Sequence, residues 1–175
     1  MKKTIGKWTL ALAALALTAA PMLANNTGPK SLEDRVRHEL LMLPHYSIFD
    51  DLSFRVDGST VYLSGDVRLP FLKSDAENTV KRIEGVTQVV DDVHVLSVSP
   101  FDNRIRAAEY RAVFGFAGMY RYAMGANPSV RIIVDNGRVK LVGFVNSRGD
   151  KNIAGIRANG VPGVFSVQND LEVAN

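Results

Sequence analysis

An internal duplication constrains this 175-residue chain more than any other feature of its sequence. Residues 134–145, with the sequence VDNGRVKLVGFV, match residues 56–67, with the sequence VDGSTVYLSGDV, without a gap. The same offset of 78 positions relates residues 54–95 to residues 132–173. A repeat of this length indicates two copies of one folding unit, so the fold of the unit has to occur twice.

The first 24 residues have the plan of a secretory signal peptide. A start with three lysines precedes the apolar run 10–20, and small residues lead up to Ala24. The apolar run is shorter than the roughly 20 residues that a permanent membrane helix requires. We therefore predict export of the chain and cleavage between Ala24 and Asn25, with an uncleaved membrane anchor as the alternative.

Removal of this segment leaves a chain with balanced charge. Three of the 21 basic side chains lie in it, so the mature chain has 18 basic and 18 acidic side chains. No broad basic surface of the kind that binds nucleic acid is expected. The sequence also lacks cysteine, which excludes disulfides and a lipid-modified cysteine, so packing alone has to hold each core.

The first unit is predicted to contain two helices and three strands. Leu32, Val36 and Leu40 recur at helical spacing after Ser31, a typical N-cap residue. Apolar residues then alternate through residues 54–67, which predicts two strands. The expected elements are a helix at 31–43, strands within 54–56 and 61–67, a helix that opens at Ser74 with a capping box to Glu77, and a strand within 86–98.

The second unit is expected to repeat this α-β-β-α-β order, with elements at 102–114, 130–134, 139–145, 150–160 and 165–173. Each unit then forms a small three-stranded mixed sheet with two helices packed on one face, which is an α+β fold. Each unit is close to the lower size limit for a core without disulfides or metals. We divide the chain into a signal peptide at 1–24, a flexible lead-in at 25–30, domain 1 at 31–98, a linker at 99–101 and domain 2 at 102–175.

The repeated unit resembles the BON (bacterial OsmY and nodulation) domain. The resemblance rests on the strands 61–67 and 139–145 and on the Gly-Val pairs at 85–86 and 163–164, and it covers nearly all of 31–173. It implies an exported or envelope-associated protein, similar to osmotically inducible periplasmic proteins. The family is regarded as a phospholipid-interacting or adhesive module, so the resemblance implies binding and no catalysis.

Four glycines shared by the two copies are interpreted as structural. Gly65 and Gly143 lie within strands, which predicts a bulge or the close approach of another backbone, such as a helix that crosses the sheet. Gly85 and Gly163 are predicted to end helices.

The outer face of the second hairpin differs from that of the first. Three outward positions are polar in the first hairpin and apolar in the second: Arg55, Ser64 and Asp66 correspond to Ile133, Val142 and Phe144. A monomeric protein rarely leaves such an apolar face in water. We expect this face either to pack on domain 1 or on a symmetric partner, or to bind a lipid or another protein.

The connection between the helix and the hairpin is nine residues longer in the second unit. It and its flanks carry aromatic and basic residues: Arg111, Phe114, Phe116, Met119, Tyr120, Arg121, Tyr122 and Met124. Aromatic rings with basic neighbours are typical of a membrane interface, where an Arg near an anionic surface contributes roughly 1 kcal/mol. The alternative is that these residues fill the core of the second unit.

The sequence contains no pattern that predicts catalysis. His38, His45 and His94 are the only histidines, and no histidine and carboxylate set has the spacing of a metal site. A nucleophile elbow, a P-loop and a dinucleotide-binding glycine pattern are also absent from the sequence. We therefore expect no catalytic residues, no metal and no cofactor.

Together these features predict a periplasmic protein, peripheral to a membrane, that binds phospholipid surfaces through domain 2. The second hypothesis is a structural or protein-interaction module that uses the apolar outer face of domain 2 to form a homodimer or to bind another envelope protein. A protective role in osmotic stress follows from the family resemblance alone.

Overall fold

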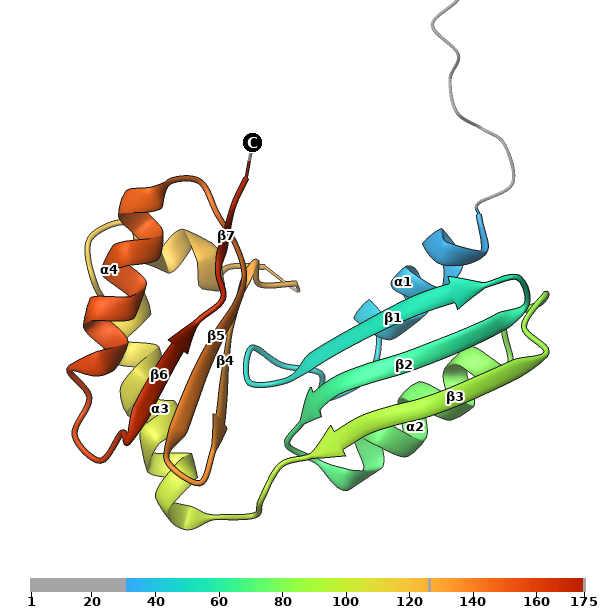
Figure 1. The fold of residues 1–175 in the computed structure, drawn as a ribbon, viewed down its shortest axis with the longest axis horizontal. Helices are drawn as coiled ribbons and strands as arrows, with labels where there is room; N and C mark the ends of the chain where they lie inside the picture. Colours follow the sequence, from blue (N-terminus) through green and yellow to red (C-terminus); the bar gives the residue numbers. More distant parts are fainter. Residues whose placement is uncertain (1–30, 126, 175) are drawn as a thin grey trace, which may run out of the picture.

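The computed structural model describes residues 31–125 and 127–174, which fold into two α+β units joined by a short connection (Figure 1). The predicted signal peptide, its cleavage site at Ala24 and Asn25, and the lead-in 25–30 lie outside the described residues. The two units are called domain 1 and domain 2 below. Domain 2 begins at Pro100, because residues 100 and 101 of the predicted linker belong to its first helix.

Domain 1 has the predicted element order. It consists of α1 (Leu32–Leu41), β1 (Asp51–Asp57), β2 (Thr60–Val67), α2 (Pro70–Lys81) and β3 (Gln88–Val95). The sheet order is β1-β2-β3, with β1 antiparallel and β3 parallel to β2. The parallel pair requires a crossover, which α2 supplies.

Domain 2 repeats this topology with one addition and one interruption. It consists of α3 (Pro100–Phe114), the short 3₁₀ helix η1 (Met119–Ala123), β4 (Val130–Asp135), β5 (Arg138–Val145), α4 (Arg148–Asn159), β6 (Ser166–Asn169) and β7 (Glu172–Val173). The predicted last strand is divided into β6 and β7, which both pair with β5 in parallel. The predicted α+β class is confirmed in both units.

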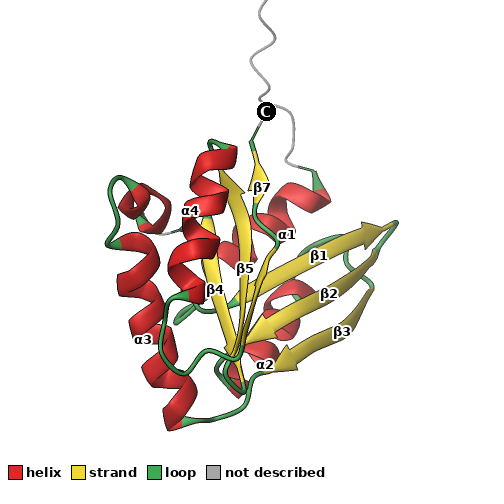
Figure 2. Cartoon of the chain, turned by 60° about the vertical axis from the view of Figure 1, so that its left-hand side comes forward, coloured by secondary structure: helices red, strands yellow, loops and turns green. Residues whose placement is uncertain are grey.

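The helices cover one face of each sheet, as predicted. Figure 2 shows α3 and α4 on the same side of the domain 2 sheet, and in Figure 1 this side faces away from domain 1. Each domain has its own apolar core under its helices. Val36, Leu63 and Leu72 are fully buried in domain 1, and Ile132 and Leu141 are fully buried in domain 2.

The observed helix starts show which local sequence signals predict a helix boundary correctly. Ser31 caps α1 as predicted, because its hydroxyl accepts from the backbone of Asp34 and the Asp34 carboxylate completes a capping box. The predicted start of the second helix at Ser74 is wrong. The helix begins at Pro70, since proline suits the first turn, where an N–H group has no partner in the helix. The same preference starts α3 at Pro100, two residues before the predicted position.

Gly65 and Gly143 permit the close approach of another backbone, as predicted. The backbone that approaches belongs to β1 or to the residue before β4, and no helix crosses the sheet at these positions. Both have positive φ, 115° and 109°. A Cβ at Gly65 would lie 2.2 Å from the carbonyl oxygen of Asp51, and one at Gly143 would lie 2.0 Å from that of Ser129. Only glycine fits these positions beside the neighbouring chain.

Gly85 and Gly163 do not end the helices directly. Helices α2 and α4 end at Lys81 and Asn159, and each glycine lies four residues further along the chain. Their φ values of 92° and 91° form the turn that leads into the last strand of each domain. The structural role is therefore confirmed, but it belongs to the turn after the helix.

The connection between α1 and β1 packs on domain 2. The Ile132 N–H group donates to the Ile48 carbonyl at 2.9 Å, and the Ile48 side chain belongs to the core of domain 2. Arg131 donates to the carbonyl oxygens of Ser47 and Asp50 at 2.8 and 3.1 Å. Residues 45–50 of this connection are called the bridging segment.

Candidate functional site

The ten residues predicted to contact a lipid or a partner are divided by the structure into a buried group and an exposed group. The side chains of Phe114, Met119 and Tyr122 are 4%, 0% and 3% exposed, and all three belong to the core of domain 2. Their predicted role as contact residues is therefore corrected. They fill the second core, which is the alternative that the sequence left open.

Tyr122 fixes η1 against the start of α4 through its hydroxyl group. The hydroxyl accepts from the backbone of Asn146 at 2.9 Å and donates to the Asp150 carboxylate at 2.9 Å. Arg121 donates to the same hydroxyl and to Asp150, both at 3.0 Å. Hydrogen bonds from Ser147, then from Tyr122, hold the pKa of Asp150 below its usual value. The charge of Arg121 is therefore paired within the molecule.

The exposed group lies where α3 ends and η1 begins. Phe116 is 38% exposed and Tyr120 is 61% exposed, and Arg111 is exposed one helical turn before the end of α3. The guanidinium of Arg157 lies 4.9 Å from the centre of the Phe116 ring, which adds a cation to this surface. The exposed residues Arg111, Phe116, Tyr120, Met124 and Arg157 are together called the aromatic cap.

The apolar outer face of the second hairpin changes along its length from buried to exposed. Ile133 is 3% exposed and lies beside Asp66 and Leu96 of domain 1, around a small cavity of about 200 Å³. Lys140, on the same face, forms an ion pair of 2.7 Å with Asp66. Ile133 is therefore removed from the candidate contact residues, because domain 1 covers it.

Val142 and Phe144 extend beyond this contact. Val142 is partly buried, and Phe144 is 55% exposed at the end of β5. Both residues line a groove between the domains. Part of the predicted apolar face is thus available for contacts at this rim.

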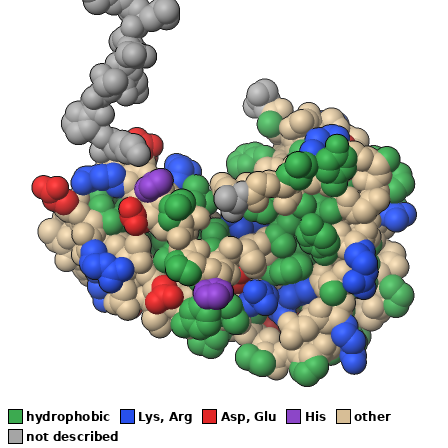
Figure 3. All heavy atoms as spheres, turned by 180° about the vertical axis from the view of Figure 1, so that it is seen from behind, with side chains coloured by type: hydrophobic (Ala, Val, Ile, Leu, Met, Phe, Trp, Pro, Cys, Tyr) green, Lys and Arg blue, Asp and Glu red, His purple; other side chains and the backbone are tan. Residues whose placement is uncertain are grey.

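The groove has a volume of about 620 Å³ and runs between domain 2 and the α1 and β1 elements of domain 1. Figure 3 shows hydrophobic side chains over the hollow between the domains, on the face opposite to the view of Figure 1. Residues 51–56 of β1 form its floor, and α1 contributes Glu33, Arg37, Leu40 and Leu41. Domain 2 contributes Asn127, Pro128, Ser129, Arg131, Val142, Gly143 and Phe144. The sequence did not predict this groove, because no local pattern encodes contacts between the two domains.

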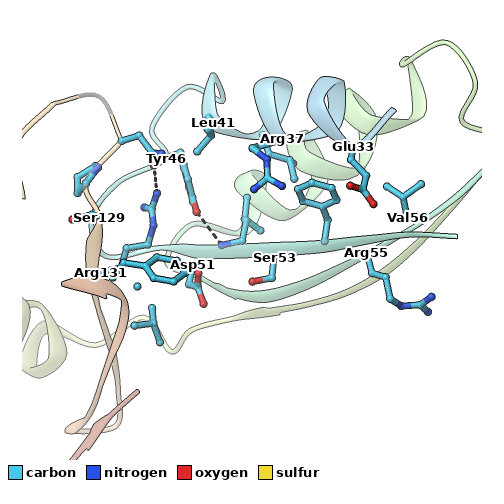
Figure 4. A pocket seen from close by; sticks show the side chains of 18 residues that line it. Glu33, Arg37, Leu41, Tyr46, Asp51, Ser53, Arg55, Val56, Ser129 and Arg131 are labelled. Atoms are coloured by element: carbon cyan, nitrogen blue, oxygen red, sulfur yellow. Dashed lines mark hydrogen bonds between the residues drawn. The ribbon is translucent and has the colours of Figure 1, made fainter. Parts of the chain in front are cut away.

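Tyr46 and Arg131 close one end of the groove (Figure 4). The guanidinium of Arg131 lies 4.3 Å from the centre of the Tyr46 ring, and the Tyr46 hydroxyl accepts from the Leu52 backbone at 3.0 Å. Burial raises the pKa of Tyr46, although the neighbouring Arg131 lowers it. The hydroxyl is therefore protonated at neutral pH and occupies the Leu52 end of the β1 edge.

A buried carboxyl group in α3, that of Glu109, was not predicted from the sequence. Glu109 is 0% exposed in the core-facing stripe of the helix, and neither carboxyl oxygen has a hydrogen-bond partner among the described residues. Burial raises its pKa to about 8, so the group is largely neutral at pH 7. A signal was present in the repeat, because the helix offset of 69 residues aligns Glu109 with the buried Leu40.

The described part of the chain offers no metal site and no membrane-spanning helix. No group of three His, Cys, Asp or Glu residues within 31–125 and 127–174 is placed to hold a metal ion. Over the same residues, none of the helices is both long enough and apolar enough to cross a bilayer.

Comparison with known proteins identifies the class to which this fold belongs. The BON domain family model matches residues 30–97 and 121–175, more than half of the chain. The chain therefore belongs to the BON domain family. The second match begins within η1 and omits α3.

One protein with a similar sequence is Osmotically-inducible protein Y of Escherichia coli (strain K12). The identity is 33% over 133 residues, which cover 70% of this chain and 61% of that protein. The chain thus spans less than two thirds of the length of this curated relative.

Two structures of CdsD, a structural protein of the Type III secretion system of Chlamydia trachomatis, also match. They cover 82% and 81% of this chain, and the chain covers 93% and 96% of theirs. The sequence identities are 17% and 15%, and the TM-scores are only 0.30 and 0.28.

Proposed function

We propose that the protein is a non-enzymatic component of the bacterial envelope that is exported to the periplasm and associates with phospholipid surfaces through domain 2. The aromatic cap carries this proposal. Phe116 and Tyr120 remain exposed although the neighbouring Phe114, Met119 and Tyr122 are buried in the core. Exposed rings beside Arg111 and Arg157 fit the region of lipid headgroups, where rings insert and cations meet anionic phosphates.

Membership of the BON family and the similarity to an osmotically inducible protein support a role in the envelope under osmotic stress. A second candidate function, binding of a protein partner, is supported by the exposed Phe144 at the rim of the groove between the domains. The two functions use different residues, because Phe144 lies on β5 and the residues of the aromatic cap lie on α3, η1, α4 and next to η1.

Sedimentation with vesicles tests the lipid proposal. The mature chain is expected to bind phosphatidylglycerol vesicles more tightly than phosphatidylcholine vesicles, and 0.5 M salt is expected to weaken binding because it screens the cations. The triple variant Arg111→Ala, Phe116→Ala, Tyr120→Ala is expected to bind at least ten times more weakly, since it lacks two exposed rings and one cation.

A matched control also removes one arginine and two aromatic rings, near the β4–β5 turn of domain 2. Phe101, Arg104 and Phe165 lie near the β4–β5 turn, where Phe165 packs on Gly137. The variant Phe101→Ala, Arg104→Ala, Phe165→Ala is expected to bind vesicles like the wild type. Equal binding by both triple variants, with circular dichroism unchanged, would contradict the assignment of the lipid surface.

A further inference from the structure

The free edge of β1 lies along the floor of the groove. The sheet order β1-β2-β3 makes β1 an edge strand. The Leu52 N–H group donates to the Tyr46 hydroxyl, so Leu52 points its backbone groups away from β2. Backbone groups alternate in direction along an antiparallel strand, so those of Phe54 and Val56 point to the same edge. Neither of their N–H groups donates to another described residue.

The duplication shows what such an edge can bind. The edge strand of domain 2 is β4, in which Ile132 corresponds to Phe54 at the offset of 78 residues. The N–H group of Ile132 is occupied, because it donates to the Ile48 carbonyl of the bridging segment. Two equivalent edges thus differ in one respect. One edge is covered by a peptide segment of the chain itself, and the other faces an open groove.

The walls of the groove match an extended peptide in chemistry. Arg37 and Arg55 lie on opposite sides of β1 (Figure 4). The guanidinium of Arg37 lies 5.5 Å from the centre of the Phe54 ring and meets no described carboxylate. Arg55 is exposed, lies 4.1 Å from the centre of the Tyr62 ring and forms an ion pair of 3.5 Å with Asp57. Val142 and Phe144 supply an apolar wall on the domain 2 side. Three arginines line the groove, Arg37, Arg55 and Arg131, against two carboxylates, Glu33 and Asp51. This excess of positive charge and the apolar wall favour a segment with acidic and apolar side chains.

We propose that the β1 edge binds an extended acidic and apolar peptide segment of a partner protein as an additional strand, with a partner carbonyl group accepting from the Phe54 N–H group. Backbone hydrogen bonds give affinity in this mode of recognition, and alternate side chains give specificity. Residues 52–56 can hold about five residues of the partner at about 3.3 Å per residue. The residues of this site are not those of the aromatic cap, so the peptide proposal can be tested independently of the lipid proposal.

The test uses the mature chain and a ten-residue peptide in which Val and Glu alternate, with blocked ends. Isothermal titration is expected to show binding, and the same peptide with Lys for Glu is expected to bind at least ten times more weakly. Methylation of alternate backbone nitrogens, in both possible registers, is expected to abolish binding in one register. If methylation in neither register weakens binding, the peptide does not join the sheet and the proposal is wrong.

Variants of Phe54 isolate the backbone contact. Phe54→Pro removes the N–H group, and proline is tolerated on the outer side of an edge strand. Phe54→Ala removes the ring and keeps the N–H group. The alanine variant is expected to retain most of the binding, and the proline variant is expected to lose at least tenfold while its vesicle binding stays unchanged. Equal peptide affinity of the two folded variants would overturn the proposal.

Hydrogen exchange in the wild type gives a readout that does not depend on a variant. Exchange of the Phe54 amide is expected to slow at least tenfold when the peptide is added, whereas exchange of the Leu52 amide, already bonded to Tyr46, changes little. Protection of Phe54 that rises with protein concentration in the absence of peptide would identify a second copy of this chain as the occupant. That outcome would replace the proposed partner peptide.

Discussion

At the scale of single residues, the buried Glu109 shows how a functional-looking group can arise from a change in the core. Its counterpart in the other copy is Leu40, which packs on the same face of the corresponding helix. The structure gives the Glu109 carboxyl no hydrogen-bond partner among the described residues and raises its pKa to about 8. The protonated form is therefore favoured by folding.

This raised pKa predicts a pH dependence of stability. The folded state holds the Glu109 proton up to about pH 8, whereas the unfolded chain releases it near pH 4.5. Stability is therefore fully present below about pH 4.5 and falls as the pH rises to about 8, by on the order of 3–5 kcal/mol. Urea unfolding at pH 5 and at pH 8.5 measures this difference.

Two variants assign the effect to the carboxyl group. Glu109→Gln is expected to lose most of the decline with pH, and Glu109→Leu is expected to add roughly 2–4 kcal/mol at pH 7, because it removes a buried group without a partner. An unchanged pH profile in the glutamine variant would mean that another group titrates.

At the scale of elements, the strands were predicted from the sequence, whereas the roles of the shared glycines were predicted only in part. Alternation located β1, β2, β4 and β5, because each strand has one buried face. The start of α2 was misplaced because a capping-box pattern inside the helix, Ser74 to Glu77, competed with the true start at Pro70. The role of Gly143 was recognised as a close approach, but its partner could not be read because it depends on the pairing of two strands.

Gly143 therefore offers a sharp test of the strand geometry. Gly143→Ala is expected to lower the free energy of unfolding by about 3 kcal/mol or more, because the new Cβ would overlap the Ser129 carbonyl oxygen at a φ of 109°. Gly149→Ala in the first turn of α4 is the matched control. It meets no backbone atom within 4 Å and is expected to change stability by at most about 1 kcal/mol in the stabilising direction.

At the scale of the whole molecule, the arrangement of the domains lay beyond the sequence pattern. The contact of Ile48 with Ile132 joins residues of the two copies, and no periodicity reports such a pair. The sequence did indicate that the face of Ile133 needs a cover, and it left open whether domain 1 or a partner supplies it. The aromatic connection likewise combined core and surface residues, because composition does not separate the buried Tyr122 from the exposed Tyr120.

The bridging segment predicts that a change in domain 1 destabilises domain 2. Ile48→Asp places a charge in the core of domain 2 and is expected to cost about 3 kcal/mol or more. Exchange of the Ile132 amide is expected to become faster, because its acceptor is the Ile48 carbonyl. Met42→Asp, in the same connection but 67% exposed, is the control and should leave this exchange rate unchanged.

The bridging segment also makes the contact between the two copies asymmetric. The connection between the first helix and the first strand of domain 1 packs on the edge strand of domain 2. The equivalent connection of domain 2 contains η1. Its residues Met119 and Tyr122 pack in the core of domain 2 itself, so this connection does not cover domain 1 in the same way. The two copies are therefore unequal, because domain 1 covers the edge strand of domain 2 while its own edge strand faces the groove.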